Sequence, residues 1–212
     1  MQRNEAQTVK LVLDDQPHEG ILALPSPCAG LVIFAHGSGS SRLSGRNNYV
    51  AQVLQDAGFA TLLFDLLTEE EDRIFENRFD IDLLARRLIQ ASQWAARETL
   101  LSNLPQGYFG ASTGAGAALK AAAQQGDMIR AVVSRGGRPD LAGEALPGVE
   151  APTLLIVGGH DPVVIDLNKE ARSRMKANCD IEIVPGATHL FEEAGTLEKA
   201  AQLATQWFER WM

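Results

Sequence analysis

The chain has 212 residues, of which 45% are hydrophobic and 22% charged, proportions that are ordinary for a globular protein with one large domain. Its formal net charge of −8 argues against nucleic acid and anionic lipid as partners, because both require clustered lysine and arginine. No segment has the apolar core of a signal peptide or the length of a membrane span, and Cys28 and Cys179 stand far apart, so we expect a cytoplasmic protein with free thiols.

Short β-rich and helical segments alternate along the first half of the chain. Thr8–Leu13 and Gly20–Leu24 flank the turn-prone sequence DDQPHEG and predict a β-hairpin. Gly30–Ala35, with the sequence GLVIFA, is a continuous apolar run, which is typical of a strand buried on both faces of a parallel sheet. Further along, we expect a helix at Tyr49–Ala57, a strand at Ala60–Phe64, a polar surface loop or helix start at Thr68–Arg78 and a helix at Ile81–Arg97.

The same alternation continues to the end of the chain. The predicted strands are Tyr108–Ala111, Ile129–Val133, Thr153–Val157 and Ile181–Val184, and the predicted helices are Thr113–Gln125, Val163–Met175 and Leu197–Trp211. This pattern predicts one α/β domain over residues 1–212, with a mostly parallel sheet of about eight strands, helices on both faces and an antiparallel N-terminal hairpin at one edge. The short connection before Thr153 leaves room for a minimal lid or none.

Ser112 lies at an abrupt junction between a predicted strand and a predicted helix. The sequence GASTG, from Gly110 to Gly114, leaves almost none of the roughly two to six residues that such a connection needs. In the pattern G-x-S-x-G, small residues at both ends let strand and helix pack closely, and the serine hydroxyl is exposed beside the positive end of the helix. The glycines could instead serve packing alone, so the surrounding polar residues must decide between the two interpretations.

Asp161 and His189 follow two later predicted strands. A serine hydroxyl becomes a good nucleophile only when a base removes its proton and an acid orients that base. The order Ser112, Asp161, His189, each at the end of a strand, is the order of the triad in α/β-hydrolases. Taken singly, Asp161 could be the N-cap of the next helix and His189 an ordinary loop histidine. Their joint occurrence after G-x-S-x-G favours a catalytic triad.

Two backbone amides are candidates for stabilising the oxyanion that forms when a nucleophile attacks a carbonyl group. One is the amide of Thr113, directly after the nucleophile, and the other comes from the glycine-rich loop HGSGSS after the third predicted strand. We assign the second amide to Ser38, with Gly39 as the alternative. The loop lacks the patterns of phosphate-binding and dinucleotide-binding loops, and we expect His36 to be structural because His189 fills the role of base.

Four arginines follow predicted strands at the same edge of the sheet. Arg42 and Arg46 come after the glycine-rich loop, and Arg135 and Arg138 lie in the sequence SRGGRPD. A guanidinium can hold a carboxylate or a phosphate through two parallel hydrogen bonds, so Arg42, Arg135 and Arg138 are possible substrate-binding residues. They could instead pair with local acids such as Asp140 and brace the loops.

With these motifs the chain resembles the dienelactone hydrolase-like branch of the α/β-hydrolase superfamily over nearly its whole length. The most specific stretches are FAHGSGSS, GYFGASTGAGAAL, APTLLIVGGHDPVV and VPGATHLFEE. The resemblance implies hydrolysis of acyl esters or lactones through an acyl-enzyme, without a metal or an organic cofactor. Dienelactone hydrolases proper carry cysteine at the elbow, whereas this chain has Ser112, which points to a serine esterase of the wider group. Similar sequences also occur joined to phosphoribosyltransferase-like domains, and we expect none within these 212 residues.

The sequence therefore predicts a serine hydrolase for small soluble carboxylic esters or lactones, since an open site suits these better than long-chain lipids. A peptidase or an acyltransferase with the same triad stays open, as does a binding module that keeps the fold without catalysis. The combination of Ser112, Asp161 and His189 speaks against the binding module, and a dehalogenase would need a carboxylate at the elbow. The expected partner is a small-molecule ester, and the oligomeric state is left open.

Overall fold

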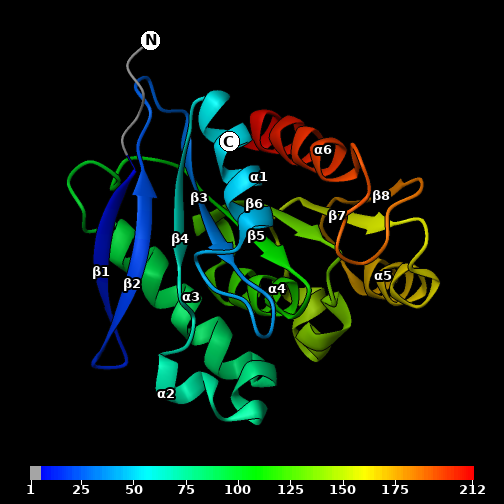
Figure 1. Ribbon diagram of the computed structural model, residues 1–212, viewed down its shortest axis with the longest axis horizontal. Coiled ribbons are helices and arrows are strands. Elements are labelled where there is room, and N and C mark those ends of the chain that lie inside the picture. Colours follow the sequence, from blue (N-terminus) through cyan, green and yellow to red (C-terminus); the bar gives the residue numbers. More distant parts are fainter. Residues whose placement is uncertain (1–5) are drawn as a thin grey trace.

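A mixed sheet runs through the centre of the molecule (Figure 1). The computed structural model describes residues 6–212, and these residues form eight strands. The strands are β1 (Gln7–Leu13), β2 (Gln16–Ala23), β3 (Gly30–Ala35), β4 (Phe59–Phe64), β5 (Gln106–Ala111), β6 (Ile129–Arg135), β7 (Thr153–Gly158) and β8 (Cys179–Val184). Their order in the sheet is β1-β2-β4-β3-β5-β6-β7-β8. The β1–β2 and β2–β4 pairs are antiparallel and all other pairs are parallel, which confirms the predicted sheet with its hairpin at one edge.

Helices cover both faces of the sheet, as predicted. The α-helices are α1 (Gly45–Asp56), α2 (Glu69–Asp72), α3 (Ile81–Ala95), α4 (Thr113–Gln125), α5 (Pro162–Arg174) and α6 (Thr196–Trp211), and short 3₁₀ segments lie at Phe75–Phe79, Gly126–Met128 and Pro139–Gly148. One hydrophobic cluster joins α3, α4 and α5 to one face, and a second joins α1 and α6 to the other (Figure 1). The strands β3, β4, β5 and β7 are buried along their whole length between these layers, which explains their continuous apolar sequences.

The N-terminal hairpin turns more tightly than the sequence predicted. Asp14 and Asp15 alone form the turn, with φ angles of 46° and 60°, and β2 begins directly afterwards. Two positive φ angles give a turn whose twist matches that of the flanking strands. The predicted turn DDQPHEG was therefore too long. Pro17 lies within β2, opposite Val12, in the part of the strand that pairs with β1 alone, so its missing N–H interrupts no second ladder.

Helix α1 also differs from the prediction, because it begins at Gly45 rather than Tyr49. Ser44 is its N-cap, and the Ser44 side chain accepts the N–H of Asn47 at 3.4 Å. The early start moves the first turn of α1 to the carboxyl end of the sheet. The polar segment after β4 is a helix start, as one of the two expectations had it, since Thr68 caps α2.

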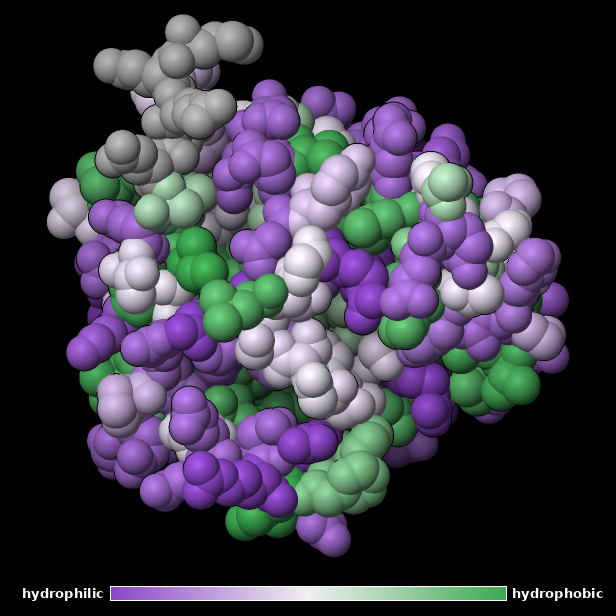
Figure 2. All heavy atoms as spheres, in the orientation of Figure 1, coloured by the Kyte–Doolittle hydropathy of each residue, from purple (hydrophilic) through white to green (hydrophobic). Residues whose placement is uncertain are grey.

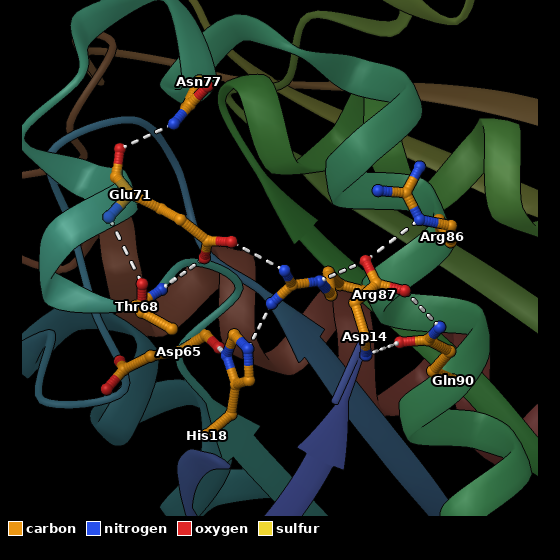
Figure 3. Close-up of polar contacts among 9 residues, drawn as sticks. All are labelled: Asp14, His18, Asp65, Thr68, Glu71, Asn77, Arg86, Arg87 and Gln90. Carbon is orange, nitrogen blue, oxygen red and sulfur yellow. Dashed lines mark hydrogen bonds and ion pairs between the residues drawn. The ribbon is translucent and has the colours of Figure 1, made fainter. Parts of the chain in front are cut away.

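A polar cluster around the buried His18 and Arg87 ties the hairpin to α2 and α3 (Figure 3). We call Asp14, His18, Glu71 and Arg87 the Arg87 cluster. Arg87 donates hydrogen bonds to Asp14 Oδ2 at 2.8 Å and to Glu71 Oε1 at 2.7 Å, and it also contacts His18 Nε2. Because a guanidinium only donates, His18 Nε2 accepts, and His18 Nδ1 donates to the carbonyl oxygen of Asp65 at 2.7 Å. His18 is therefore neutral, and burial lowers its pKa accordingly.

The face of the molecule seen in Figure 2 is mainly hydrophilic. Its hydrophobic residues form separate green areas with purple side chains between them, rather than one broad area. Within residues 6–212, no helix combines the length and the apolar character that crossing a bilayer requires. Cys28 and Cys179 are both free thiols, as the sequence predicted.

Candidate active site

Ser112 occupies a strained turn between β5 and α4. Its φ and ψ angles are 51° and −123°, and a positive φ is unfavourable for a residue with a side chain. Glycine is needed on both sides of this turn: a Cβ atom at Gly110 would lie 2.5 Å from the Cα atom of Ala115, and one at Gly114 would overlap the carbonyl oxygen of Ala35. The close approach of strand and helix removes the ordinary connecting loop. The turn thus presents the Ser112 side chain at the carboxyl end of the sheet.

Three polar side chains from separate loops meet at this turn. Ser112 Oγ lies 3.2 Å from His189 Nε2, and His189 Nδ1 lies 2.7 Å from Asp161 Oδ2. Asp161 stands at the N-cap position of α5, but its side chain makes no capping hydrogen bond and contacts the histidine instead. The Asp161 carboxylate accepts from Nδ1, which leaves Nε2 as the acceptor for the serine proton. The arrangement has the geometry of a nucleophile, a base and an orienting acid.

The glycine-rich loop packs directly against the nucleophile turn. A Cβ atom at Gly37 would lie 3.1 Å from the Cβ atom of Ser112. The N–H of Ser38 donates to the hydroxyl oxygen of Thr113 at 2.8 Å. As the first residue of α4, Thr113 has an N–H without an intrahelical partner. Both amides of the expected oxyanion hole therefore lie next to Ser112, and the Ser38 amide would have to leave or share the Thr113 hydroxyl in order to bind an oxyanion.

His36 is held in a structural role by two hydrogen bonds. Its Nε2 accepts the backbone N–H of Leu66 at 3.0 Å, and its Nδ1 lies 3.0 Å from the carbonyl oxygen of Gly37. The ring must therefore be neutral with the proton on Nδ1. Burial lowers the pKa of His36, which favours the same form. His36 links β3 to the segment after β4 and so fixes the base of the glycine-rich loop.

A small cavity of about 100 Å³ opens beside Ser112. Its lining residues come from the glycine-rich loop, the start of α1, the carboxyl ends of β5 and β6 and the loop after β8: Gly37, Ser38, Ser40, Ser44, Arg46, Asn47, Ala111, Ser112, Arg135, Gly136, His189 and Leu190. A larger cleft of about 390 Å³ shares Ser40 with it and extends between the hairpin and α2. The 3₁₀ segment Pro139–Gly148 between β6 and β7 packs against α4 and contributes no lining residue to the cavity.

Two of the three arginines that the sequence singled out are engaged by carboxylates. Arg42 contacts Asp65 and Glu19, and Arg138 donates to Asp140 Oδ1 and Oδ2 at 2.8 and 2.7 Å. These are the bracing contacts that the sequence left open as the alternative. Neither Arg42 nor Arg138 lines the cavity beside Ser112.

Arg135 has different surroundings. It is 7% exposed, and its Nε and Nη1 atoms have no hydrogen-bond partner among the described residues. Its Nη2 donates to Asn47 Oδ1 at 3.3 Å, and its guanidinium lies 5.9 Å from the ring centre of Phe191. Burial, together with the nearby charge of Arg46, lowers the pKa of Arg135 to about 10.

The sequence missed the part that the first turn of α1 plays in this cavity. Ser44, Arg46 and Asn47 line it, whereas the predicted helix began only at Tyr49. The sequence SGRNN contains a usable signal, because serine followed by glycine and asparagine is a common start of a helix. The sequence alone does not indicate which other residues the first turn of α1 faces.

The fold and this site define a class. A mostly parallel sheet, a strained serine turn between a strand and a helix, and the chain order Ser112, Asp161, His189 are the features of an α/β-hydrolase. Residues 19–212 match the dienelactone hydrolase family, so the chain belongs to that family. Membership supports an enzyme of the hydrolase type.

Solved structures agree with this assignment. A dienelactone hydrolase from Anabaena variabilis is 52% identical, with a TM-score of 0.95 over 98% of each chain. Est1E from Butyrivibrio proteoclasticus has a TM-score of 0.82 at 15% identity, covering 96% of this chain and 98% of that protein, which shows a shared fold.

Two curated relatives from strains of Mycobacterium tuberculosis extend the comparison. Each is 60% identical over 202 residues and bears the name "Putative phosphoribosyl transferase". The match covers 95% of this chain but 46% of each relative, so the chain spans about half of their length. That name describes proteins about twice as long as this chain.

Proposed function

We propose that this protein is a serine hydrolase that cleaves small carboxylic esters or lactones through an acyl-enzyme. The observation that carries the proposal is the contact of Ser112 Oγ with His189 Nε2 at 3.2 Å, on a residue whose backbone is strained to φ 51°. Backbone strain of this kind persists where the surroundings enforce it, and it gathers at functional sites. A turn that served packing alone would have no need of a histidine and a carboxylate aligned behind its serine.

The first half of the proposed reaction forms the acyl-enzyme. His189 Nε2 takes the proton of Ser112 as Oγ attacks the ester carbonyl, and Asp161 holds the imidazole and stabilises its positive charge. The oxyanion that forms is bound by the amides of Ser38 and Thr113. His189 then gives its proton to the departing alcohol.

The second half releases the acid. Water enters in place of the alcohol, loses a proton to His189 and attacks the acyl carbon. His189 then returns this proton to Ser112 Oγ as the bond between Oγ and the acyl carbon breaks, which frees the acid. The residues of this chain supply all proton transfers, so no cofactor is needed. The small cavity beside Ser112 and the short connection between β6 and β7 favour small acyl esters.

Serine in place of cysteine at the elbow separates this chain from the dienelactone hydrolases proper. A peptidase or an acyltransferase uses the same triad, and the partition of the acyl-enzyme between water and other nucleophiles decides between them. The name of the curated relatives belongs to proteins of which the match to this chain covers 46%.

Labelling with a fluorophosphonate, followed by hydrolysis of p-nitrophenyl esters of graded chain length, tests the proposal. We expect the wild-type protein to be labelled and to prefer short esters, and the Ser112→Ala variant to lose both labelling and turnover. Turnover of the esters at an unchanged rate by Ser112→Ala would overturn the proposal. An amine added to the assay tests for acyl transfer, since an acyltransferase would form the amide in preference to the acid.

A further inference from the structure

The cavity beside Ser112 holds positive charge that no acidic lining residue balances. Arg46 and Arg135 line it, and its lining contains neither aspartate nor glutamate. Arg135 is 7% exposed, and two of its three nitrogen atoms lack a hydrogen-bond partner among the described residues. A buried guanidinium without an anion is strongly unfavourable, since its lost hydration is not replaced. A ligand that brings an anion into the cavity would remove this imbalance.

Helix α1 adds a second, independent feature that favours an anion. Three residues of its N-terminal end, Ser44, Arg46 and Asn47, line the same cavity. The helix is 12 residues long and has no acidic residue in its first turn. The first N–H groups of a helix lack intrahelical partners and carry the positive end of its dipole, which favours phosphate and other anions at a helix N-terminus. In α1 the N–H of Asn47 already donates to Ser44 Oγ at 3.4 Å, so the dipole and the earlier N–H groups carry this contribution.

Arg46 can turn toward such an anion. Its Nη1 lies 3.0 Å from Glu192 Oε1, and the two side chains are 37% and 62% exposed. A pair this exposed is weak, so Glu192 holds Arg46 only loosely. Arg135, at the end of β6, and Arg46, in the first turn of α1, thus line the cavity from two separate elements.

We propose that this cavity is a phosphate-binding subsite, so that the ester cleaved at Ser112 carries a phosphate group; the inference rests on the proposed hydrolase function. A phosphate monoester has a charge of about −1.5 to −2 near neutral pH and three acceptor oxygens. That charge matches two arginines, and three oxygens can meet donors from both β6 and α1. A carboxylate has one charge and two oxygens in a plane, so it would match only one of the two arginines.

The position of the subsite places the phosphate a few bonds from the reacting ester. Arg135 pairs with Ala111 across β5 and β6, and the N–H of Ser112 points to the carbonyl oxygen of Arg135 at 3.4 Å. The cavity of about 100 Å³ is small beside the roughly 300–1,000 Å³ of sites that hold whole ligands, so it admits one substituent. The cleft that shares Ser40 with it can take the rest of the substrate.

Inorganic phosphate tests the subsite without a phosphorylated substrate. Isothermal calorimetry on the wild-type protein and on Ser112→Ala, with acetate at equal ionic strength as the control anion, measures binding whether or not an ester is turned over. We expect phosphate to bind both proteins and acetate to bind neither. Arg135→Met and Arg46→Gln should each weaken phosphate binding about 10- to 150-fold, the usual value of a charge-assisted hydrogen bond. Arg138→Gln is the matched control and should bind as the wild type does. Absence of phosphate binding, or binding that survives both Arg135→Met and Arg46→Gln, would overturn the subsite.

Three acetyl esters of one three-carbon chain test the substrate class. Propyl acetate, 4-acetoxybutyrate and 3-acetoxypropyl phosphate end in hydrogen, carboxylate and phosphate. We expect kcat/KM to be highest for the phosphate, and its ratio to that of propyl acetate to fall about 10- to 150-fold in Arg135→Met and in Arg46→Gln. A preference for the carboxylate, or equal losses for all three esters, would contradict the proposal. If no ester is cleaved, the proposed hydrolase function is wrong. The calorimetry with inorganic phosphate then tests the phosphate-binding subsite independently of any turnover.

Discussion

Two arginines of this chain are almost equally buried and have opposite electrostatic surroundings. Arg87, at 2% exposed, has two carboxylates and a neutral histidine around its guanidinium (Figure 3). Arg135, at 7% exposed, has an amide oxygen, an aromatic ring and a second arginine nearby, and no carboxylate among the described residues is within ion-pair distance of it.

The difference between them separates structure from function. The free energy lost when a charge leaves water is recovered only when oppositely charged or polar partners surround that charge. In the Arg87 cluster, residues of the hairpin and α2 are these partners for an arginine of α3. At the Ser112 cavity the chain leaves a guanidinium uncompensated and a serine in a strained backbone conformation. Such features reduce stability, so they indicate a site where a ligand completes the interactions.

The largest effect is expected at Ser112. Ser112→Ala should lower kcat for p-nitrophenyl acetate by about 10⁴- to 10⁶-fold, because the acyl-enzyme can no longer form. Its thermal stability should be unchanged or higher, since strained functional turns reduce stability. Steady-state kinetics measure the loss of kcat, and a melting curve measures the thermal stability. A large loss of melting temperature would show that the turn supports the fold in the way the Arg87 cluster does.

The second prediction concerns His189. In the wild-type protein kcat/KM should fall as the pH is lowered, because a protonated imidazole cannot accept the proton of Ser112. His189→Gln should lose activity by a factor of the same order as Ser112→Ala, and the residual rate should no longer show this pH dependence. A pH–rate profile of both proteins is the measurement. The same acid-side decline in the variant would move the role of base to another group.

Arg87→Met should reduce the free energy of unfolding by about 3 kcal/mol, because Asp14 and Glu71 would keep their charges without their main partner. The turnover of p-nitrophenyl acetate should be retained, since Arg87 does not line the cavity beside Ser112. Urea unfolding and an activity assay measure the two quantities. Loss of activity in a variant that is still folded would contradict the separation of the two regions.

The pH dependence of stability tests the Arg87 cluster more finely. Burial alone would raise the pKa of Asp14, but hydrogen bonds from Arg87, Gln90 and Arg86 outweigh it and lower the pKa from 3.8 to about 2. A lowered pKa in the folded state contributes stability that is present above the unfolded value and is lost as the pH falls through the folded one. We expect protonation of Asp14 to lower the free energy of unfolding by about 2 kcal/mol as the pH falls from about 4 to 2.

Asp14→Asn provides the control for that measurement. It removes the titrating group, so its free energy of unfolding should fall less steeply below pH 4 than that of the wild type. Urea unfolding at several pH values compares the two slopes. Parallel curves would mean that other carboxylates dominate the acid sensitivity.

The smallest effect is expected for Arg135→Met, the matched partner of Arg87→Met. The free energy of unfolding should stay the same or rise by about 1 kcal/mol, because an apolar side chain of similar length replaces an uncompensated charge. Urea unfolding of both variants under one set of conditions gives the comparison. A loss as large as that of Arg87→Met would make Arg135 a structural brace.

The sequence alone was sufficient for the elements whose signals are local. Continuous apolar runs gave the buried strands, and α4 has the predicted bounds Thr113–Gln125 because the alanine-rich sequence and the flanking glycines act within a few residues. The order of Ser112, Asp161 and His189 at strand ends also followed from the sequence. The distances between these three side chains did not follow from the sequence. The sequence predicted only that they lie near one another, because the carboxyl ends of parallel strands meet at one edge of the sheet.

The tertiary structure decided which polar groups find partners. All four arginines near the predicted site looked alike in the sequence, and only packing separated the braced Arg42 and Arg138 from the uncompensated Arg135. The contact of the Ser38 amide with Thr113 and the place of Asn47 in the cavity likewise depend on segments far apart in the chain. A hydrogen bond is set by geometry at a scale of about 3 Å, which no residue pattern encodes, because it depends on how layers pack against one another.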